Sequence, residues 1–104
     1  MYYILEDKVP KRVTREEWVN DGYVKISSAP YYHRVKRTEI DDILISTVFT
    51  GVNSCWDDEQ PPLVFETRVF NGPMDGWCDR YSTWEEAEKG HQEIVEKVNQ
   101  TLFI

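Results

Sequence analysis

The sequence offers few side chains for acid–base chemistry, and His91 is the one best placed to take part in it. It falls in the middle of an apolar helical pattern, where a general base oriented by a carboxylate such as Glu66 is one interpretation. A buried histidine more often fills the core, with one ring nitrogen hydrogen-bonded to a backbone group or a tyrosine hydroxyl. We therefore expect a structural His91 and keep an enzyme as the alternative hypothesis.

Cys55 and Cys78 could form a disulfide, or bind a metal together with His33 and His91. The strand pattern places the two cysteines at opposite ends of one strand, on the order of 20 Å apart, which is beyond disulfide reach. Their spacing matches no zinc site. No phosphate loop, nucleophile elbow, zincin motif, Cys-x-x-Cys pair or calcium loop occurs in the chain. The sequence predicts two free thiols, as in a reducing cytosol, and neither a metal nor a cofactor.

Tryptophans beside acidic residues mark a candidate protein-binding surface. A long acidic loop carries one tryptophan followed by three carboxylates, and a second loop carries an aspartate two residues before another tryptophan. A lone carboxylate triplet lacks the six or more oxygens of a calcium site, whereas a tryptophan with an acidic rim is typical of interface anchors. A solvated loop is the alternative. The predicted protein-binding residues are Trp56, Asp57, Asp58, Glu59, Asp75 and Trp77.

An aromatic and basic segment suggests a different kind of site. Tyrosines stack on nucleobases and arginines neutralise phosphate, so such a segment suits a nucleotide-like small molecule. Tyrosines packed under the edge of a sheet, with the bases in water, are the structural alternative. The residues concerned are Tyr31, Tyr32, Arg34 and Arg37.

The chain of 104 residues has a formal net charge of −7, and this charge is unevenly distributed. Residues 1–37 hold eight bases and five acids, a net of +3, whereas residues 38–104 hold four bases and 14 acids, a net of −10. Acidic surface repels nucleic-acid phosphates and attracts basic protein surfaces. We therefore expect a protein partner with a basic surface and no direct contact with nucleic acid.

The composition is that of a single folded domain spanning residues 1–104. The hydrophobic fraction is 40% and the aromatic fraction 13%, which is too rich for a disordered acidic tail. No apolar run approaches the ~18 residues of a membrane span, and no basic segment followed by an apolar one marks the start for secretion. Four tryptophans are hard to bury completely in so small a domain, which would favour a homodimer.

The first third of the chain predicts one strand and one short helix. Residues 2–5 are aromatic and β-branched, which indicates a strand that is stopped by Val9-Pro10. Thr14 and Glu17 have the spacing of a capping box, so a helix is expected over about 15–20, ending near Gly22.

From residue 34 onward the pattern predicts an antiparallel sheet. The candidate strands are 35–39, 43–50, 63–70 and 76–81. In the strand 43–50, alternation assigns one face to the core, and that face carries Ile43, Ile45, Thr47 and Phe49.

The last predicted element is a helix that begins after a second capping-box spacing, from Ser82 to Glu85. Gly90 costs such a helix about 1 kcal/mol, and its expected purpose is the close approach of a bulky neighbour. Apolar residues recur at steps of three and four on one helical face, at Trp84, Ala87, His91, Ile94, Val95, Val98 and Leu102. The predicted fold class is α+β: an antiparallel β-sheet of about four strands covered on one face by a C-terminal helix, with a short N-terminal helix.

Four segments carry a resemblance to known proteins: residues 38–40 (TEI), 45–51 (ISTVFTG), 61–67 (PPLVFET) and 80–91 (RYSTWEEAEKGH). Through them, roughly residues 38–91 resemble a family of small phage and prophage proteins that has no established activity. The resemblance implies an origin in a bacterial virus or its integrated remnant, and a location in the host bacterial cytoplasm. It implies no catalytic residue.

These observations together predict a small acidic accessory protein that binds and modulates a host protein without catalysis. A defence factor that handles nucleic acid is the kind of partner that its acidic surface would fit. A binder of a nucleotide-like small molecule is the first alternative, and a virion or morphogenesis component is a further one.

Overall fold

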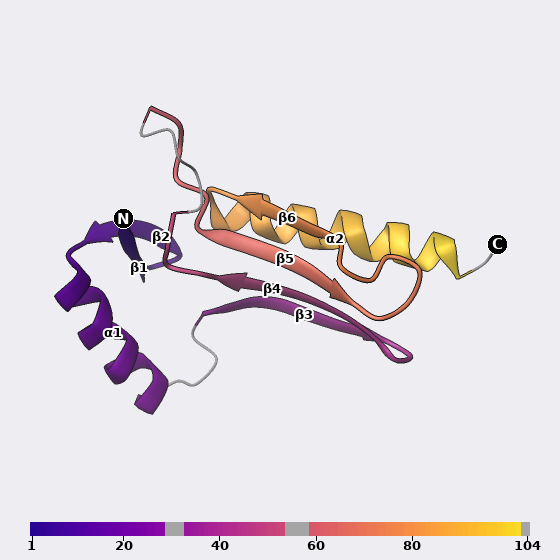
Figure 1. Cartoon of the computed structure of the whole chain (residues 1–104), viewed down its shortest axis with the longest axis horizontal. Helices are drawn as coiled ribbons and strands as arrows, with labels where there is room; N and C mark the ends of the chain where they lie inside the picture. The colour runs from indigo at the N-terminus through magenta and orange to yellow at the C-terminus, as the bar shows by residue number, and fades with distance from the viewer. Residues whose placement is uncertain (29–32, 54–58, 103–104) are drawn as a thin grey trace.

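The computed structural model describes residues 1–28, 33–53 and 59–102, which form two sheets and two helices (Figure 1). A hairpin and a helix come first, and a four-stranded sheet with a long helix follows. In chain order the elements are β1 (Tyr2–Glu6), β2 (Val9–Val13), α1 (Arg15–Ser28), β3 (Arg34–Ile40), β4 (Ile43–Phe49), β5 (Phe65–Phe70), β6 (Cys78–Tyr81) and α2 (Trp84–Thr101).

The larger sheet is an antiparallel meander in the order β3-β4-β5-β6, and α2 packs along one of its faces (Figure 1). Burial in β4 alternates strictly, with Ile43, Ile45, Thr47 and Phe49 all buried. Every second side chain of a strand points to the same side of the sheet, so these four face α2. The predicted α+β fold class and the predicted core face are confirmed.

The helix α2 begins one residue later than the capping-box spacing predicts. The cap is Thr83, whose Oγ1 accepts a hydrogen bond from the Glu86 amide at 3.1 Å and donates to the Glu86 carboxylate at 3.0 Å. The predicted pair of Ser82 and Glu85 is therefore wrong by one position. Leu102, which the periodicity assigns to the apolar face, lies after the helix and is exposed.

The core is made of two apolar clusters separated by a polar layer. One cluster contains Ile43, Ile45, Val69, Ile94 and Val98, and the other contains Phe49, Val64, Phe65, Tyr81 and Ala87. Between them lie three fully buried polar residues, Thr47, Thr67 and His91. A buried polar layer of this kind requires that its members satisfy one another by hydrogen bonds.

The N-terminal third departs most from the sequence prediction. Val9-Pro10 does not end strand structure: the chain turns at Asp7 and Lys8, both with positive φ, and returns as β2. Pro10 is tolerated because each strand of a two-stranded sheet has a free edge. The helix α1 is capped by Thr14 as predicted, but it continues through Gly22 to Ser28.

The hairpin and α1 attach to the end of β4 through Gly51. The Tyr3 amide donates to the Gly51 carbonyl at 2.8 Å. Gly51 has φ +74°, and a Cβ at this position would stand 2.6 Å from Trp18 Nε1. Gly51 is therefore required both by the backbone conformation and by the close approach of α1.

A bulge in β3 changes which residues share a face of the sheet. The register with β4 shifts between Arg34 and Lys36, so Arg34 lies opposite Val48 and Lys36 lies opposite Thr47. One extra residue in a strand reverses the alternation beyond it. None of the described helices is long and apolar enough to cross a membrane.

Candidate functional site

His91 is completely buried in the polar layer and hydrogen-bonded through both ring nitrogens. Its Nε2 lies 2.7 Å from the Thr38 hydroxyl, and its Nδ1 lies 2.7 Å from the Thr47 hydroxyl. The Thr47 hydroxyl is also 2.5 Å from the Thr67 hydroxyl. A neutral imidazole carries one N–H, so one of its two threonine partners accepts a hydrogen bond and the other donates one. The expected backbone or tyrosine partner is replaced by these hydroxyls.

The surroundings of His91 favour its neutral form. Burial, and to a smaller degree the positive charge of Lys36, lower the pKa of His91 from 6.5 to about 4. Glu66 cannot orient the ring, because it pairs with Val48 and Arg80 on the opposite face of the sheet. The contacts of His91 therefore support its structural interpretation rather than a general base.

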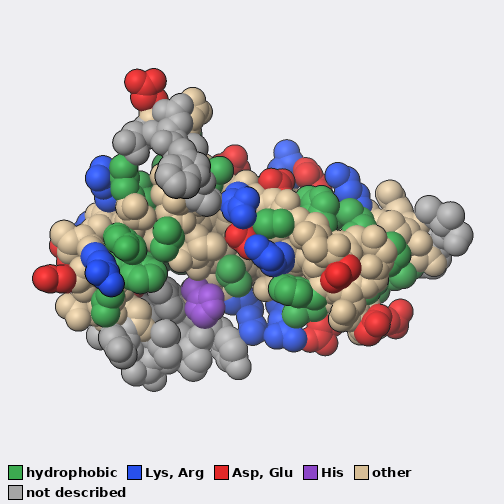
Figure 2. Space-filling model, viewed as in Figure 1, with side chains coloured by type: hydrophobic (Ala, Val, Ile, Leu, Met, Phe, Trp, Pro, Cys, Tyr) green, Lys and Arg blue, Asp and Glu red, His purple; other side chains and the backbone are tan. Residues whose placement is uncertain are grey.

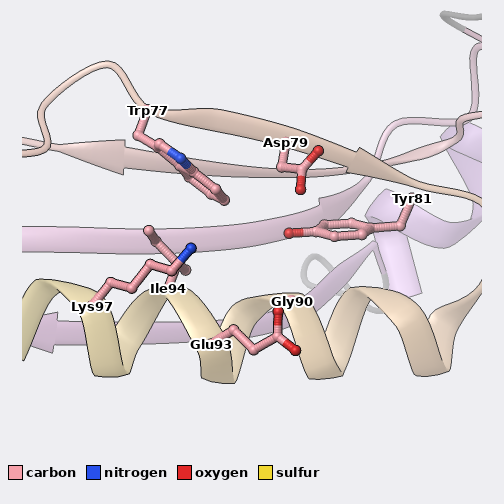
Figure 3. A pocket seen from close by; sticks show the side chains of 7 residues that line it. All are labelled: Trp77, Asp79, Tyr81, Gly90, Glu93, Ile94 and Lys97. Carbon is pink, nitrogen blue, oxygen red and sulfur yellow. The ribbon is translucent and has the colours of Figure 1, made fainter.

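A small pocket opens between β6 and α2, next to this polar layer (Figure 3). Its volume is about 80 Å³. One wall comes from the segment that contains β6, and the other comes from two turns of α2. The lining residues are Trp77, Asp79, Tyr81, Gly90, Glu93, Ile94 and Lys97.

Tyr81 lines the pocket and carries a buried hydroxyl with no hydrogen-bond partner among the described residues. The side chain is 9% exposed. Burial raises the pKa of Tyr81, while the Thr67 hydroxyl, which lies nearby without a hydrogen bond of normal geometry, has a smaller opposite effect. The negative charges of Asp79 and Glu93 raise this pKa further.

Gly90 allows the tyrosine ring to lie against α2. A Cβ at Gly90 would overlap the ring and the hydroxyl of Tyr81. The prediction that Gly90 permits the close approach of a bulky group is confirmed, and Tyr81 is that group. Gly90 itself also lines the pocket.

The chemistry of the lining is that of a site for a small cation. Figure 3 shows Trp77 and Asp79 directed from the β6 segment toward α2, the Tyr81 ring lying along the helix, and Glu93 and Lys97 on the helix below them. Two carboxylates, an indole ring and a hydroxyl are groups that hold an ammonium or a guanidinium. The Lys97 ammonium lines the pocket as well, so the charged side chains of the lining, Asp79, Glu93 and Lys97, sum to −1. The volume is well below the ~300 Å³ at which pockets for whole small molecules begin, so it fits the end of a side chain.

No group of three or more candidate metal ligands occurs in the part of the chain that the structure describes. Cys78 is a free, half-buried thiol, as predicted. Cys55 lies outside the described residues.

The predicted protein-binding residues are distributed over different parts of the structure. Trp56, Asp57 and Asp58 lie outside the described residues, and Glu59 is exposed. Asp75 accepts a hydrogen bond from the Asn71 amide at 2.6 Å and so closes the turn before β6. Trp77 is half-buried against the first apolar cluster and lines the pocket. Of the predicted residues that the structure describes, Glu59, Asp75 and Trp77, only Trp77 lines the pocket.

Asp79, Tyr81, Glu93 and Lys97 are the polar pocket residues that sequence reasoning missed. The one available signal was Gly90, whose expected bulky neighbour proved to be Tyr81. Asp79 lies opposite the buried Thr67 in the sheet register and therefore faces α2. An aspartate is not expected on the core side of a strand unless it lies at an edge, which is where the sheet order places β6.

The predicted ligand-binding residues divide in a similar way. Tyr31 and Tyr32 lie outside the described residues. Arg34 and Arg37 belong to β3 and point away from α2, on the face of the sheet that also carries Arg68 and Arg80. In β5, Glu66 and Arg68 alternate with the buried Phe65 and Thr67. This alternation was the sequence signal that Arg68 lies on the face of the sheet away from α2.

Comparison with known proteins gave no match to a family model, a curated protein or a solved structure. The resemblance to phage and prophage proteins therefore stays a prediction.

Proposed function

We propose that this chain is a small acidic accessory protein that binds and modulates a host protein with a basic surface, without catalysis. The observation that carries the proposal is the pocket between β6 and α2, whose lining combines an indole ring, a net charge of −1 from Asp79, Glu93 and Lys97, and a buried hydroxyl with no hydrogen-bond partner among the described residues. A lysine or arginine side chain of the partner is the group that would fill it.

The partner's cation would sit between Asp79 and Glu93 and donate to the Tyr81 hydroxyl. A buried polar group without a partner costs about 1–3 kcal/mol, and a donor from the bound protein would remove that cost. The face of the Trp77 ring would add a cation–π contact of about 0.5–2 kcal/mol. Binding would thus satisfy a group that has no hydrogen-bond partner in the part of the chain that the structure describes.

The helix α2 extends the negative charge around the pocket. It carries five glutamates and two lysines, a net of −3. Charges of one sign around a binding site steer an oppositely charged partner and raise the association rate, an effect that salt screens. A protein that normally holds nucleic acid has the basic surface that such a helix would attract. The resemblance to phage proteins supports a host factor, such as a defence protein, as the partner.

A peptide titration tests the proposal. The probes are short arginine-rich and lysine-rich peptides, with binding measured by calorimetry on the wild type and on Asp79→Asn/Glu93→Gln. The matched control is Glu85→Gln/Glu96→Gln, which removes the same charge from α2 outside the pocket. We expect the pocket variant to bind at least about tenfold more weakly, or about 1.4 kcal/mol, and the control to change by less than about twofold.

Equal weakening of both variants would show only a diffuse attraction between charges and would contradict the pocket. Absence of binding at low salt would refute the proposed function as a whole.

A further inference from the structure

The face of the four-stranded sheet that points away from α2 has a charge opposite to that of the rest of the molecule. We call it the outer face, and its charged residues are Arg34, Arg37, Glu39, Glu66, Arg68 and Arg80. These six sum to +2, so the remaining residues of the chain sum to −9. Figure 2 shows Lys and Arg side chains gathered over the middle of this sheet, with acidic and hydrophobic side chains beside them.

The bulge in β3 assembles this face. Arg34 and Arg37 are three positions apart, so in a regular strand they would point to opposite sides of the sheet. The register shift between Arg34 and Lys36 restores them to one side and turns Lys36 toward the face that carries Thr47. Val35 packs against the second apolar cluster. A bulge that re-aims side chains in this way is a common feature of binding edges.

The bases of the outer face are all arginine. The chain has six arginines and six lysines, and four of the arginines but none of the lysines belong to this face. Lysine serves as well as arginine for general surface charge, whereas the planar guanidinium presents paired donors that match phosphate or carboxylate oxygens. The choice of arginine therefore indicates recognition of an anion.

Carboxylates on the same face hold three of the arginines in position. Glu66 Oε1 lies 2.7 Å from Arg68 Nε, and Glu66 Oε2 lies 3.4 Å from Arg80 Nε. Arg37 pairs with Glu39 at 2.6 Å. The three arginine side chains are nevertheless 42% to 50% exposed, so their remaining donors face solvent. Glu39 and Glu66 act as positioning residues for an anion site.

The size of the face favours a small ligand over a protein. Four strands about 4.8 Å apart and about six residues long cover roughly 400 Å². This is about half of the ~800 Å² that each partner contributes to a standard protein interface. A long nucleic acid would extend onto surfaces that sum to −9. We propose that the outer face binds a small molecule with two or more phosphate groups, such as a nucleoside polyphosphate, through Arg34, Arg37, Arg68 and Arg80.

The site is tested by calorimetry at low salt with inorganic tripolyphosphate, ATP and orthophosphate as probes. We expect Arg37→Gln/Arg68→Gln to bind tripolyphosphate at least about tenfold more weakly than the wild type. The matched control Arg12→Gln/Arg15→Gln removes two exposed arginines from β2 and α1 and should change the affinity by less than about twofold. Arg68→Lys keeps the positive charge but lacks the paired donors of the guanidinium group. Most of the loss in affinity for tripolyphosphate should therefore remain in this variant.

The probes also separate the sources of the phosphate. Tighter binding of ATP than of tripolyphosphate identifies a nucleotide, and equal binding identifies a polyphosphate; both support the site. Orthophosphate that binds as tightly as tripolyphosphate would overturn the need for two phosphate groups. An octaglutamate peptide that binds more tightly than tripolyphosphate would overturn the ligand class in favour of an acidic protein segment. No binding of any phosphate probe would overturn the site.

Discussion

The buried His91 makes the stability of the fold depend on pH in a defined direction. Its pKa is about 4 in the folded state, against an ordinary value of 6.5. The folded state therefore disfavours the protonated ring, and the free energy of unfolding falls as the pH falls below 6.5. The total contribution is about 3.5 kcal/mol at ~1.4 kcal/mol per pKa unit, and about 2.5 kcal/mol of it is lost by about pH 4.5.

The substitution that isolates this contribution is His91→Gln. A glutamine amide can donate to one of Thr38 and Thr47 and accept from the other, as the imidazole does, but it does not titrate. Urea unfolding is measured between about pH 7 and about pH 4.5 for the wild type, for His91→Gln and for the control His33→Gln. Acidic side chains that titrate in this range are present in all three proteins and cancel in the comparison.

We expect the wild type and His33→Gln to lose about 2.5 kcal/mol more than His91→Gln over this interval. The same pH dependence in wild type and His91→Gln would refute the neutral, buried histidine. A gain in wild-type stability at acid pH relative to the variant would mean that the fold holds His91 protonated, which is the reverse of what its burial predicts.

The remaining predictions concern the pocket wall. Gly90→Ala should destabilise the protein by about 1–3 kcal/mol because its methyl group overlaps the Tyr81 ring, whereas Gly22→Ala, with open space around it in α1, should gain up to about 1 kcal/mol. Thermal or urea unfolding measures both changes in stability. A Gly90→Ala variant that is more stable than the wild type would contradict the close packing of Tyr81 against Gly90. Tyr81→Phe should leave stability unchanged or raise it by about 1 kcal/mol, since the lost hydroxyl has no partner among the described residues. The same variant should bind cationic peptides more weakly, so a strong loss of stability with unchanged binding would count against the site.

Periodicity was sufficient to predict the sheet and α2. The alternation in β4 and the helical spacing of Ala87, His91, Ile94 and Val98 reflect burial on one face, and burial is what the structure shows at these positions. The N-terminal third was harder because β1 and β2 form only a two-stranded sheet, in which Pro10 and polar residues are tolerated. Burial imposes little pattern on such a hairpin.

The candidate sites depend on features that local sequence does not encode. The pocket needs β6 to be an edge strand beside α2, which follows from the order of the sheet and brings Asp79 near Glu93. The outer face needs the bulge after Arg34, and no residue type in β3 predicts a bulge. Sequence reasoning identified Trp77 and Arg37 as candidates but could not identify the residues that tertiary structure places beside them.

The measurement that tests the proposed cation pocket most directly is a titration of the tryptophan indole N–H signals by NMR with an arginine-rich peptide. Trp77 lines the pocket, whereas Trp18 packs against Tyr2 and Trp84 donates to Glu88. We expect a saturable shift of the Trp77 signal that is absent in Asp79→Asn/Glu93→Gln and much smaller at Trp18 and Trp84. A Trp77 signal that stays in place while the peptide binds would contradict the pocket as the binding site.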